Sequence, residues 1–550
     1  MKKLTPTEYL GLFNRLTDEQ ADYLAEWRTL NDYLLTGRSL YYNTTKSRKL
    51  NFSPVKTVNP HASLALQVLA SGFHGGLTSP ARPWFSYDFP DPRVKRIPQL
   101  TSWLDSSLSA MYNALAKSNF YESMRSGYSE FAGFGNICIG LFKGEQPEQP
   151  DLQFQLLTAG EYVTILSSTG ELVCLIRQLF LTYDEMIKCW PNTCSEDVKS
   201  NAKISPYKYK SVLHIVHECK NYKLPWISLY IEVGTGQVLK EAGFDECPYF
   251  YAPWDIVSFD LYGTGPGSAA LPDIKRLQEI EKAFLMATHK SLDPPVSAPA
   301  HKRGKINTLP GGINYYRSAS DKIESLYDVK FDYQGAMGAV ERIDQRISRF
   351  FFNEVFLTAT RDPNASPLKA AEVNVRNEEK LLRLGPVLER LHTLVLKPML
   401  KRAFNILKKK GKIEELPPEL QKLAETFDIE FVSILAKSQK LIETRTVSDV
   451  LAFAGSMAQI KPEILDLIDG DAALREYADT VGAPATILVD DGQVKKIREA
   501  RQQQIAQKEA QQQQMAQQQQ GLDAQKAQSE IASNYAGAGS NMRDSLQGMI

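Results

Sequence analysis

The pattern of apolar and polar positions is helical over most of the first 126 residues. Thr17 and Gln20 have the spacing of a capping box, which predicts a helix start at this point. Residues 62–77 and 100–126 are two further apolar stretches with helical spacing. Between them, the proline-rich residues 79–92 predict an extended or turning chain. The N-terminal region is therefore expected to consist mainly of helices.

Over residues 152–260 the apolar positions follow a period of two. Short alternating runs are separated by glycine turns at Ala159-Gly160 and Thr169-Gly170. Alternation that is broken by frequent turns is typical of antiparallel strands. We therefore predict a mainly β lobe here and an α+β fold for the chain as a whole.

Two amphipathic helices are predicted on either side of a proline-rich insert. The helices cover residues 268–292 and 336–357, and the insert between them, residues 293–335, is rich in proline, glycine and serine. Each helix has one apolar stripe, formed by Leu271, Ile274, Leu277 and Phe284 in the first and by Val340, Ile343, Ile347 and Phe350 in the second.

A long helix is predicted after a loop at residues 358–366. Ser366-Pro367 suits the N-cap and the first helical position, and Gly411 after three lysines suits the residue that follows the helix end. Gly385-Pro386 and Pro398 are expected to kink or interrupt this helix.

The chain from residue 440 onward is predicted to be helical, and it is less apolar than the preceding part. Residues 502–520 are dominated by glutamine and alanine, which are good helix formers, but their apolar stripes are thin. An ordered helical barrel and a disordered tail therefore remain open alternatives for this region.

Length and composition place the chain among ordinary globular proteins. With 550 residues the chain is too long to fold around a single hydrophobic core, so roughly two to four domains or lobes are expected. Hydrophobic residues make up 43% and charged residues 23%. The longest apolar runs are far too short to span a bilayer, and the N-terminus lacks a signal peptide pattern. We expect no membrane segment, and a protein that is intracellular or delivered without the usual secretion route.

Charge and cysteine content narrow the function classes further. Six cysteines without the spacing of a disulfide scaffold favour reduced thiols. The 64 basic residues are balanced by 64 acidic ones. Tight binding to DNA depends largely on neutralised phosphates and usually shows as a basic excess. Strong static DNA binding is therefore disfavoured, whereas transient or sliding contact stays open.

The stretch YGTGPGSAA, residues 262–270, invites a comparison with phosphate-binding loops. A Walker loop would need G-x-x-x-x-G-K-[ST], and a dinucleotide turn would need G-x-G-x-x-G, whereas the glycines here are Gly263, Gly265 and Gly267. Pro266 removes one backbone N–H, and Asp273 follows where it would repel a phosphate. The favoured interpretation is a hinge where a strand passes into a helix.

The sequence gives little support for a metal site or a catalytic site. Cys189, Cys194, His214, His217 and Cys219 are residue types that bind zinc, but the two closely spaced pairs of a zinc site are missing. In a strand, His214 and His217 would point to opposite faces. No hydrolase, metalloprotease or calcium-loop motif is present. We therefore expect neither a metal nor a cofactor, and no enzyme activity.

Basic residues cluster in and beside the helix–insert–helix region. A solvated face is the usual explanation of such clusters, and a weak phosphate-facing lining is the functional alternative. The clusters are residues 301–305 in the insert, Lys275-Arg276, residues 342–349 and Arg361.

Several passages, in order, resemble the portal or head-to-tail connector proteins of short-tailed bacteriophages. They span most of the chain and are together more specific than any single glycine pattern. The passages are ASGFHGGLTSPARPWF (70–85), NFYESMRSGYSEFAGFGN (119–136), YGTGPGSAALPDIKRLQEIEKA (262–283), AAEVNVRNEEKLLRLGPVLERL (370–391) and VGAPATILVDDGQVKKIREAR (481–501).

This resemblance implies a subunit of a ring, usually of twelve copies, around a channel for double-stranded DNA. Each subunit of such a ring has a wing, a stem of two helices, a clip between them and a C-terminal crown or barrel. On this chain the resemblance implies a wing (1–267, β-rich over 152–260), stem helices (268–292 and 336–357), a clip (293–335), a tunnel loop (358–366), a wing helix and return (367–439), a helical crown or barrel (440–510) and a glutamine-rich tail (511–550).

The resemblance also implies a function and partners. The ring would sit at one vertex of the capsid in the virion, after assembly in the bacterial cytoplasm with capsid and scaffolding proteins. It would dock the terminase packaging motor, then tail adaptor proteins, and conduct DNA during packaging and ejection. The residues expected to face DNA are Arg361, Lys275, Arg276, Arg346 and Arg349, and those expected to dock the motor or tail are His301, Lys302, Arg303, Lys305, Tyr315 and Tyr316.

Two interpretations from other classes remain beside this one. The first is a phosphate-handling enzyme that uses the glycines of residues 263–267. The second is a helical scaffold or adaptor built around residues 492–530, which would form small oligomers through its tail.

Overall fold

The protein divides into two compact units, Met1–Glu443 and Thr444–Ile550. In the second unit, residues 497–504 are helical. The computed structural model describes residues 2–35, 57–91, 94, 97–219, 222–255, 260–326, 332–357, 384–417, 420 and 426–432 of the first unit, and residues 470, 494, 497–504, 526, 529 and 531 of the second.

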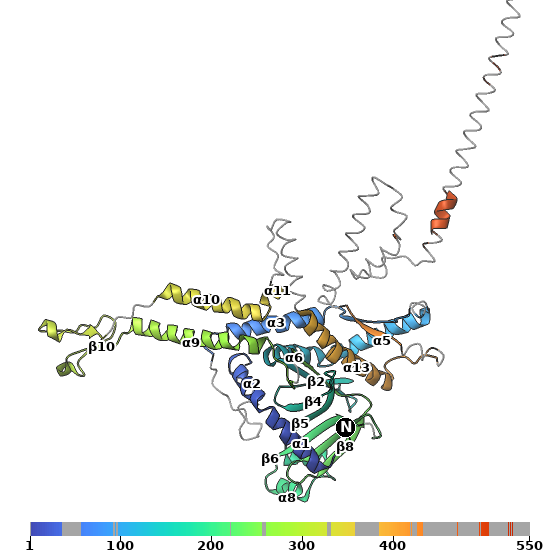
Figure 1. Cartoon of the computed structure of the whole chain (residues 1–550), viewed down its shortest axis with the longest axis horizontal. Coiled ribbons are helices and arrows are strands. Elements are labelled where there is room, and N and C mark those ends of the chain that lie inside the picture. Colours follow the sequence, from blue (N-terminus) through green and yellow to red (C-terminus); the bar gives the residue numbers. More distant parts are fainter. Residues whose placement is uncertain are drawn as a thin grey trace, which may run out of the picture. The chain divides into compact units, whose positions relative to one another are not determined.

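The first unit mixes helices and strands, as the α+β prediction requires (Figure 1). Its helices are α1 (Pro6–Glu19), α2 (Ala21–Tyr33), α3 (His61–Leu77), α5 (Pro98–Lys117), α6 (Phe120–Phe134), α7 (Tyr183–Cys189), α8 (Glu196–Ile204), α9 (Pro266–Leu292), α10 (Tyr333–Phe350), α11 (Asn353–Leu357) and α13 (Lys397–Lys409). Its strands are β1 (Phe85–Asp88), β2 (Asn136–Lys143), β3 (Leu152–Leu157), β4 (Tyr162–Leu166), β5 (Leu172–Thr182), β6 (Tyr209–Glu218), β7 (Trp226–Glu232), β8 (Val238–Phe244), β9 (Tyr249–Pro253), β10 (Val296–Ser297), β11 (Glu324–Ser325) and β12 (Asp428–Phe431).

The N-terminal region forms two helices, and the first, α1, precedes the capping pattern of Thr17 and Gln20. Thr5 is the N-cap of α1, and its backbone N–H donates to the Glu8 carboxylate at 2.7 Å in a complete capping box. Thr17 lies inside α1 and is not a cap, whereas the helix predicted to follow Gln20 is confirmed as α2, which begins at Ala21. Gln20 separates α1 from α2 and donates its side-chain amide to the Tyr162 carbonyl at 2.9 Å. This contact with the sheet replaces the expected cap.

The segment 100–126 was predicted as one helix and is two. α5 ends at Lys117, and α6 begins at Phe120 after a short turn. The Ser118 hydroxyl donates to the Leu115 carbonyl at 2.7 Å at the end of α5. The proline-rich passage is extended as predicted, because β1 pairs antiparallel with β12 within it.

Two antiparallel sheets form the β lobe. The larger has the order β4-β5-β6-β7-β8, and the smaller has the order β3-β2-β9. α1 covers one face of the larger sheet, where Tyr9 and Leu16 join a buried cluster with Ile215 and Leu229. α7 and α8 contribute Met186 and Val198 to a second cluster that includes Val212 on β6. The larger sheet is therefore covered on both faces.

β2 lies outside the region predicted to be β-rich. Residues 136–141 of this strand are all buried, so both of its faces lack the polar positions that give a period of two. Its neighbours in the principal core include Phe131 of α6 and Leu400 of α13. Burial on both faces therefore explains why the alternation test missed this strand.

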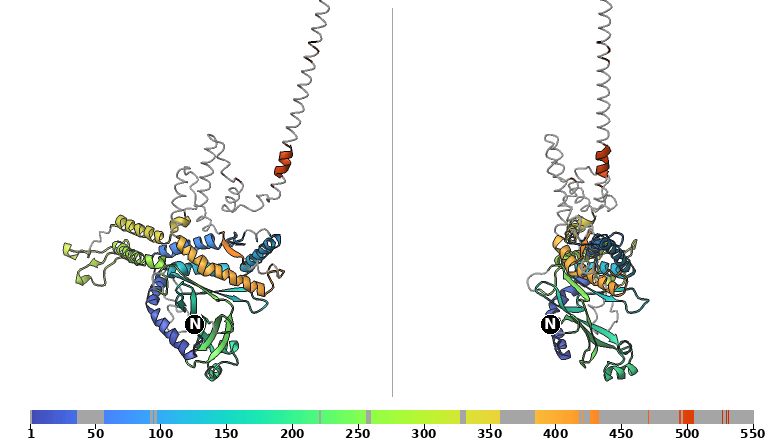
Figure 2. Two further views of the ribbon diagram at one scale, coloured as in Figure 1. Left: turned by 45° about the vertical axis from the view of Figure 1, so that its right-hand side comes forward. Right: turned by 90° about the vertical axis from the view of Figure 1, so that its right-hand side faces the viewer.

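α9 and α10 lie side by side, and the insert between them reaches beyond their far ends (Figures 1 and 2). α9 begins two residues before the predicted start. α10 ends at Phe350, so the prediction of one helix to residue 357 is wrong. Phe352 has φ +53°, and this left-handed residue separates α10 from α11. The insert carries a two-residue ladder between β10 and β11.

The predicted long helix is described from residue 384 onward. A π-helical turn, His392–Leu396, ends two residues before Pro398, which confirms the predicted interruption. Pro398 has no N–H to donate to the carbonyl one turn earlier. Gly411 has φ +67° after the C-cap Lys410, as predicted for the helix end. Ser366-Pro367 and the loop 358–366 lie outside the described residues.

Candidate functional site

The glycines Gly263, Gly265 and Gly267 lie against the C-terminal end of α6. A Cβ atom on Gly267 would stand 2.2 Å from the Gly133 carbonyl oxygen, and one on Gly265 would stand 2.9 Å from the Gly135 Cα. Gly135 itself is left-handed, with φ +78°. These glycines therefore permit a close backbone joint between α6 and α9. Hinge motion at this joint stays a prediction.

Asn136 is the first residue of β2, and its hydrogen bonds connect the smaller sheet to the joint between α6 and α9. This residue is 1% exposed, and its side-chain oxygen accepts from the Tyr251 hydroxyl at 2.6 Å and from the Gly263 N–H at 2.9 Å. Its amide nitrogen donates to the Phe134 carbonyl at 3.0 Å. The Gly263 N–H is thus bound within the protein, and it is not directed at a ligand. A phosphate cradle at these glycines finds no support in this geometry.

Two of the basic residues expected in a channel are paired with carboxylates. Arg346 on α10 approaches Asp273 on α9 with an Nη2–Oδ1 distance of 2.8 Å. Arg349 approaches Glu354 on α11 with an Nε–Oε1 distance of 3.5 Å. Both arginines are exposed, so their interaction with DNA phosphates would compete with these pairs.

Lys275 and Arg276 are exposed on α9, and among the described residues neither forms an ion pair. Lys282 is also exposed and follows Lys275 by seven residues. Seven residues are about two helical turns, so both lysines lie on one side of α9. The sequence reasoning missed Lys282, although this spacing was a usable signal. Arg361 lies outside the described residues.

Several residues expected to dock a partner are exposed in the insert between α9 and α10. Tyr315 is 85% exposed and Tyr316 is 60% exposed. Arg303 and Lys305 are exposed as well. The side chain of His301 lies outside the described part of the chain.

Lys302 differs from the other basic residues of the insert. Its ammonium group donates to the Tyr315 carbonyl at 2.7 Å and to the Asp321 carbonyl at 3.1 Å. Two of its three donors are therefore directed into the insert itself. Direct contact between Lys302 and a partner stays a prediction.

The cysteines and histidines whose residue types suit zinc are spread over the β lobe. His217 Nε2 lies 2.6 Å from the Tyr9 hydroxyl, on the face covered by α1. His214 stacks on Tyr230 at a ring distance of 4.2 Å, on the opposite face, as predicted. Within the described residues, no three Cys, His, Asp or Glu side chains are grouped as a metal site.

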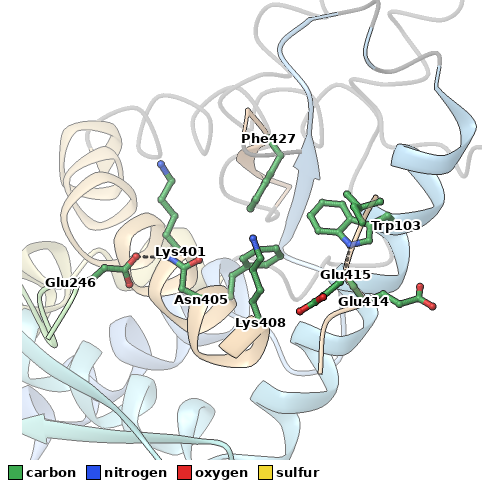
Figure 3. A pocket seen from close by; sticks show the side chains of 10 residues that line it. Trp103, Glu246, Lys401, Asn405, Lys408, Glu414, Glu415 and Phe427 are labelled. Atoms are coloured by element: carbon green, nitrogen blue, oxygen red, sulfur yellow. Dashed lines mark hydrogen bonds between the residues drawn. The ribbon is translucent and has the colours of Figure 1, made fainter. Parts of the chain in front are cut away.

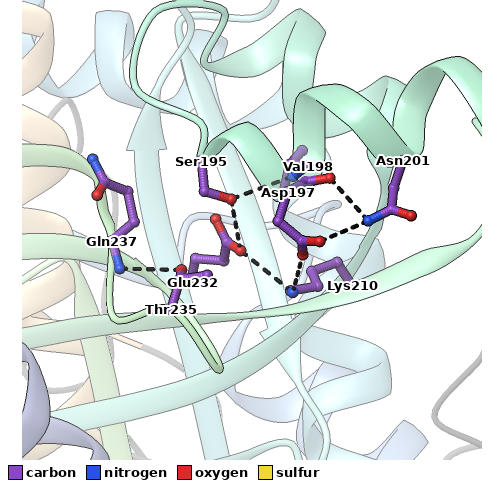
Figure 4. Close-up of polar contacts among 8 residues, drawn as sticks. All are labelled: Ser195, Asp197, Val198, Asn201, Lys210, Glu232, Thr235 and Gln237. Carbon is purple, nitrogen blue, oxygen red and sulfur yellow. Dashed lines mark hydrogen bonds and ion pairs between the residues drawn. The ribbon is translucent and has the colours of Figure 1, made fainter.

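A polar network anchors α8 to the larger sheet (Figure 4). Glu232 is fully buried, and its Oε1 accepts from the Ser195 hydroxyl at 3.1 Å and lies 3.4 Å from the Lys210 ammonium. Lys210 also pairs with Asp197 at 3.1 Å. Ser195 accepts from the Val198 N–H at 3.3 Å as the N-cap of α8. The network therefore has a structural role, because it holds the first turn of α8 against β6 and β7.

A hollow of about 450 Å³ lies beside α13 (Figure 3). Lys401 and Lys408 line it from the helix, and Glu414 and Glu415 line it from the chain that follows. Trp103 is held in place because its indole N–H donates to the Glu414 carbonyl at 2.8 Å. Among the described residues that line it there is no Ser, Cys or His.

Across the described residues, every helix is too short or too polar to cross a lipid bilayer.

The sequence of residues 7–488 matches the family model described as "Bacteriophage head to tail connecting protein". A protein of Bordetella phage BPP-1 named "Probable portal protein" is 30% identical over 521 residues, which cover 90% of this chain and 92% of the relative. The "Portal protein" of Salmonella phage epsilon15 is 30% identical over 510 residues, covering 89% of this chain and 90% of the relative.

Solved structures of gene transfer agent particles also match at low similarity. A chain from the neck of an empty particle has 11% identity and a TM-score of 0.35, and the match covers 78% of this chain and 98% of that chain. A chain from a native virion has 9% identity and a TM-score of 0.32, with coverage of 78% and 91%.

Proposed function

The chain belongs to the family of bacteriophage head to tail connecting proteins, and we propose that it forms a ring of twelve copies that conducts double-stranded DNA. The family makes it a portal-type structural protein of the phage particle. The observation that carries the proposal is the family match over residues 7–488, nearly the whole chain. The ring would stand at the capsid vertex between the head and the tail.

In this proposal α9 and α10 are the stem and the insert between them is the clip. The two helices pack along each other, and the insert extends past their ends. The rest of the first unit, with the two sheets of the β lobe and α3, α5, α6 and α13, is the wing, and the region from residue 440 onward is the crown or barrel. The clip is the surface that would dock the terminase motor during packaging and tail adaptor proteins afterwards.

The electrostatics of the stem suit DNA that slides. Each lysine or arginine that contacts a phosphate adds a counterion-release contribution to binding, so many such contacts would hold the DNA. Lys275, Arg276 and Lys282 are exposed on α9, whereas Arg346 is partly neutralised by Asp273. The balance of 64 basic and 64 acidic residues in the chain agrees with weak, transient contact.

Negative-stain images of the purified full-length chain test the ring. We expect closed rings with a central hole, because subunits of a connector associate head to tail around a closed axis. The rings should persist when residues after Gln502 are removed. Small oligomers that dissociate on this truncation would instead support the scaffold interpretation built on residues 492–530.

Arg361→Ala tests the proposed tunnel loop. We expect reduced DNA packaging or retention with rings of normal appearance, because one phosphate contact per subunit is lost while the ring contacts are kept. Packaged DNA per particle and ring images measure the two effects separately. Normal packaging in this variant would contradict the assignment of residues 358–366 as a tunnel loop.

The enzyme alternative receives no structural support at the glycines. The backbone N–H of Gly263 is bound by Asn136, and α9 begins at Pro266, which lacks an N–H. ATP turnover by the purified chain that is lost in a Gly265 variant with intact rings would favour this alternative.

A further inference from the structure

The described part of the insert between α9 and α10, residues 293–326, has no hydrophobic core of its own. Among residues 293–326 with a described side chain, none is buried. A segment of this length without buried apolar groups lacks the main stabilising contribution of a folded domain. The conformation of the insert therefore depends on its hydrogen bonds.

Within its described residues, 293–326, the insert includes three sets of hydrogen bonds that connect positions far apart in the segment. The first is the β10–β11 ladder, which the Leu326 N–H extends by donating to the Pro295 carbonyl at 2.7 Å. The second is a reciprocal pair, in which the Asn307 N–H donates to the Asn314 side-chain oxygen at 2.8 Å and the Asn314 amide donates to the Asn307 carbonyl at 2.7 Å. The third is Lys302.

Lys302 connects parts of the insert that the other two sets leave separate. The Asn307–Asn314 pair closes the loop at the tip, and the ladder closes the base. Lys302 lies between them in the sequence and binds the carbonyls of Tyr315 and Asp321 on the returning chain. Hydrogen bonds from a charged donor are stronger than neutral ones. Lys302 therefore links the two sides of the insert at its middle, and we call this pair of hydrogen bonds the brace.

Beside the brace lie four exposed apolar side chains, those of Leu309, Ile313, Tyr315 and Tyr316, which we call the crest. Leu309 is 73% exposed, Ile313 71%, Tyr315 85% and Tyr316 60%. Gly312 donates to the Leu309 carbonyl at 2.8 Å, so a tight turn places Leu309 and Ile313 at the tip. Lys302 binds the backbone of Tyr315, and through it fixes where the two tyrosines stand. Large exposed aromatic and aliphatic groups are typical anchors of protein interfaces.

The charge around the crest is positive. Between residues 296 and 326 there are five basic and two acidic residues, a net charge of +3. Arg303, Lys305 and Arg317 are exposed, and they form no ion pair within the described part of the chain. A partner that matches this surface would offer an apolar groove with an acidic rim.

We propose that Lys302 is a positioning residue, which holds the crest of Leu309, Ile313, Tyr315 and Tyr316 in shape for insertion into an apolar, acid-rimmed groove of the packaging motor. The inference rests on the proposed docking function of the clip. In this inference the apolar crest makes the binding contact, and Arg303, Lys305 and Arg317 supply the positive charge that faces the acidic rim. Lys302 acts through the backbone and does not touch the partner.

The test compares Lys302→Met with Lys305→Met in full-length rings. The probe is the purified packaging ATPase of the same phage, and its Kd is measured at several salt concentrations. Lys302→Met should weaken binding by about tenfold and leave the salt dependence unchanged, because no charge at the interface is lost. Lys305→Met should weaken binding by about twofold to threefold and flatten the salt dependence. Hydrogen exchange of residues 303–326 should rise in Lys302→Met and stay unchanged in Lys305→Met.

Two further variants separate the brace from the docking function. Lys302→Arg keeps charged donors and should restore much of the protection from exchange. Tyr315→Ala should weaken binding by about tenfold without raising exchange. Unchanged exchange and affinity in Lys302→Met, or a salt dependence flattened as in Lys305→Met, would overturn the positioning role. Raised exchange in Lys302→Met with full affinity in both Lys302→Met and Tyr315→Ala would overturn the docking surface and leave the brace standing.

Discussion

Gly267→Ala is expected to destabilise the first unit by about 3 kcal/mol or more, because the new methyl group meets backbone that cannot rotate away. The added Cβ would stand 2.2 Å from the Gly133 carbonyl oxygen and 3.1 Å from the Leu34 Cδ1. Gly133 lies in α6, which is packed in the principal core through Phe131 and Phe134. Either α9 or α6 must shift, and both carry buried side chains of that core.

Thermal unfolding of the full-length chain at one protein concentration measures this effect. The matched control is Gly338→Ala, since Gly338 lies inside α10 and an added Cβ would have nothing within 4 Å. Alanine is favoured over glycine inside helices by about 1 kcal/mol, so the control should be neutral or slightly stabilised. Equal unfolding midpoints for Gly267→Ala and the unchanged chain would show that the joint is not tightly packed.

Acidification from pH 7.5 to pH 5 is expected to destabilise the protein strongly, because buried histidines stay neutral in the folded state. Burial lowers the pKa of His392 to about 4. Burial, with Arg177 beside it, lowers the pKa of His214 well below its usual value, and burial lowers the pKa of His217. Histidine in an unfolded chain has a pKa of about 6.5.

The direction of the change in stability with pH follows from the uptake of protons by the unfolded chain. Below pH of about 6.5 the unfolded chain binds protons that the folded chain does not, so stability rises with pH in this range. The stabilising contribution of each histidine is present above pH of about 6.5. It is lost as the pH falls through this value towards the folded pKa, which for His392 is about 4. For one histidine the loss at pH 5 is about 2 kcal/mol, from about 1.4 kcal/mol per pH unit.

His392→Phe isolates one of these contributions. His392 stacks on Phe431 at a ring distance of 4.1 Å, and phenylalanine can keep this stacking without titrating. Urea unfolding at pH 7.5 and pH 5 should show a loss of stability that is smaller by about 2 kcal/mol in the variant than in the unchanged chain. The same loss in both chains would contradict the role of His392.

Elements with a clear local signal were predicted well. The apolar stripe of Ile274 and Leu277 placed the first long helix within two residues, and Gly411 marked a helix end. The Thr5–Glu8 capping box is an equally local signal, with Pro6 at the first helical position, whereas the similar spacing at Thr17 and Gln20 does not form a cap. Two competing local signals could not be ranked without the packing.

Elements that depend on distant neighbours were missed. β2 is buried on both faces, so no alternation marks it. The break at Phe352 requires a left-handed residue that is neither glycine nor asparagine, which local preference argues against. The role of Lys302 follows from carbonyls 13 and 19 residues away, and nothing in the run 301–305 distinguishes it from its basic neighbours.

The amino-acid order alone established the class and the family resemblance of this protein, because many short-range patterns and several ordered passages agree with one another. It also located the helix–insert–helix segment and excluded a regular phosphate loop. The fold was needed to show what the individual residues do. Gly263, Gly265 and Gly267 look like a flexible turn in the sequence, and three-dimensional packing shows them pressed against α6 and tied to Asn136. Contacts of this kind join residues more than a hundred positions apart, and no local pattern records them.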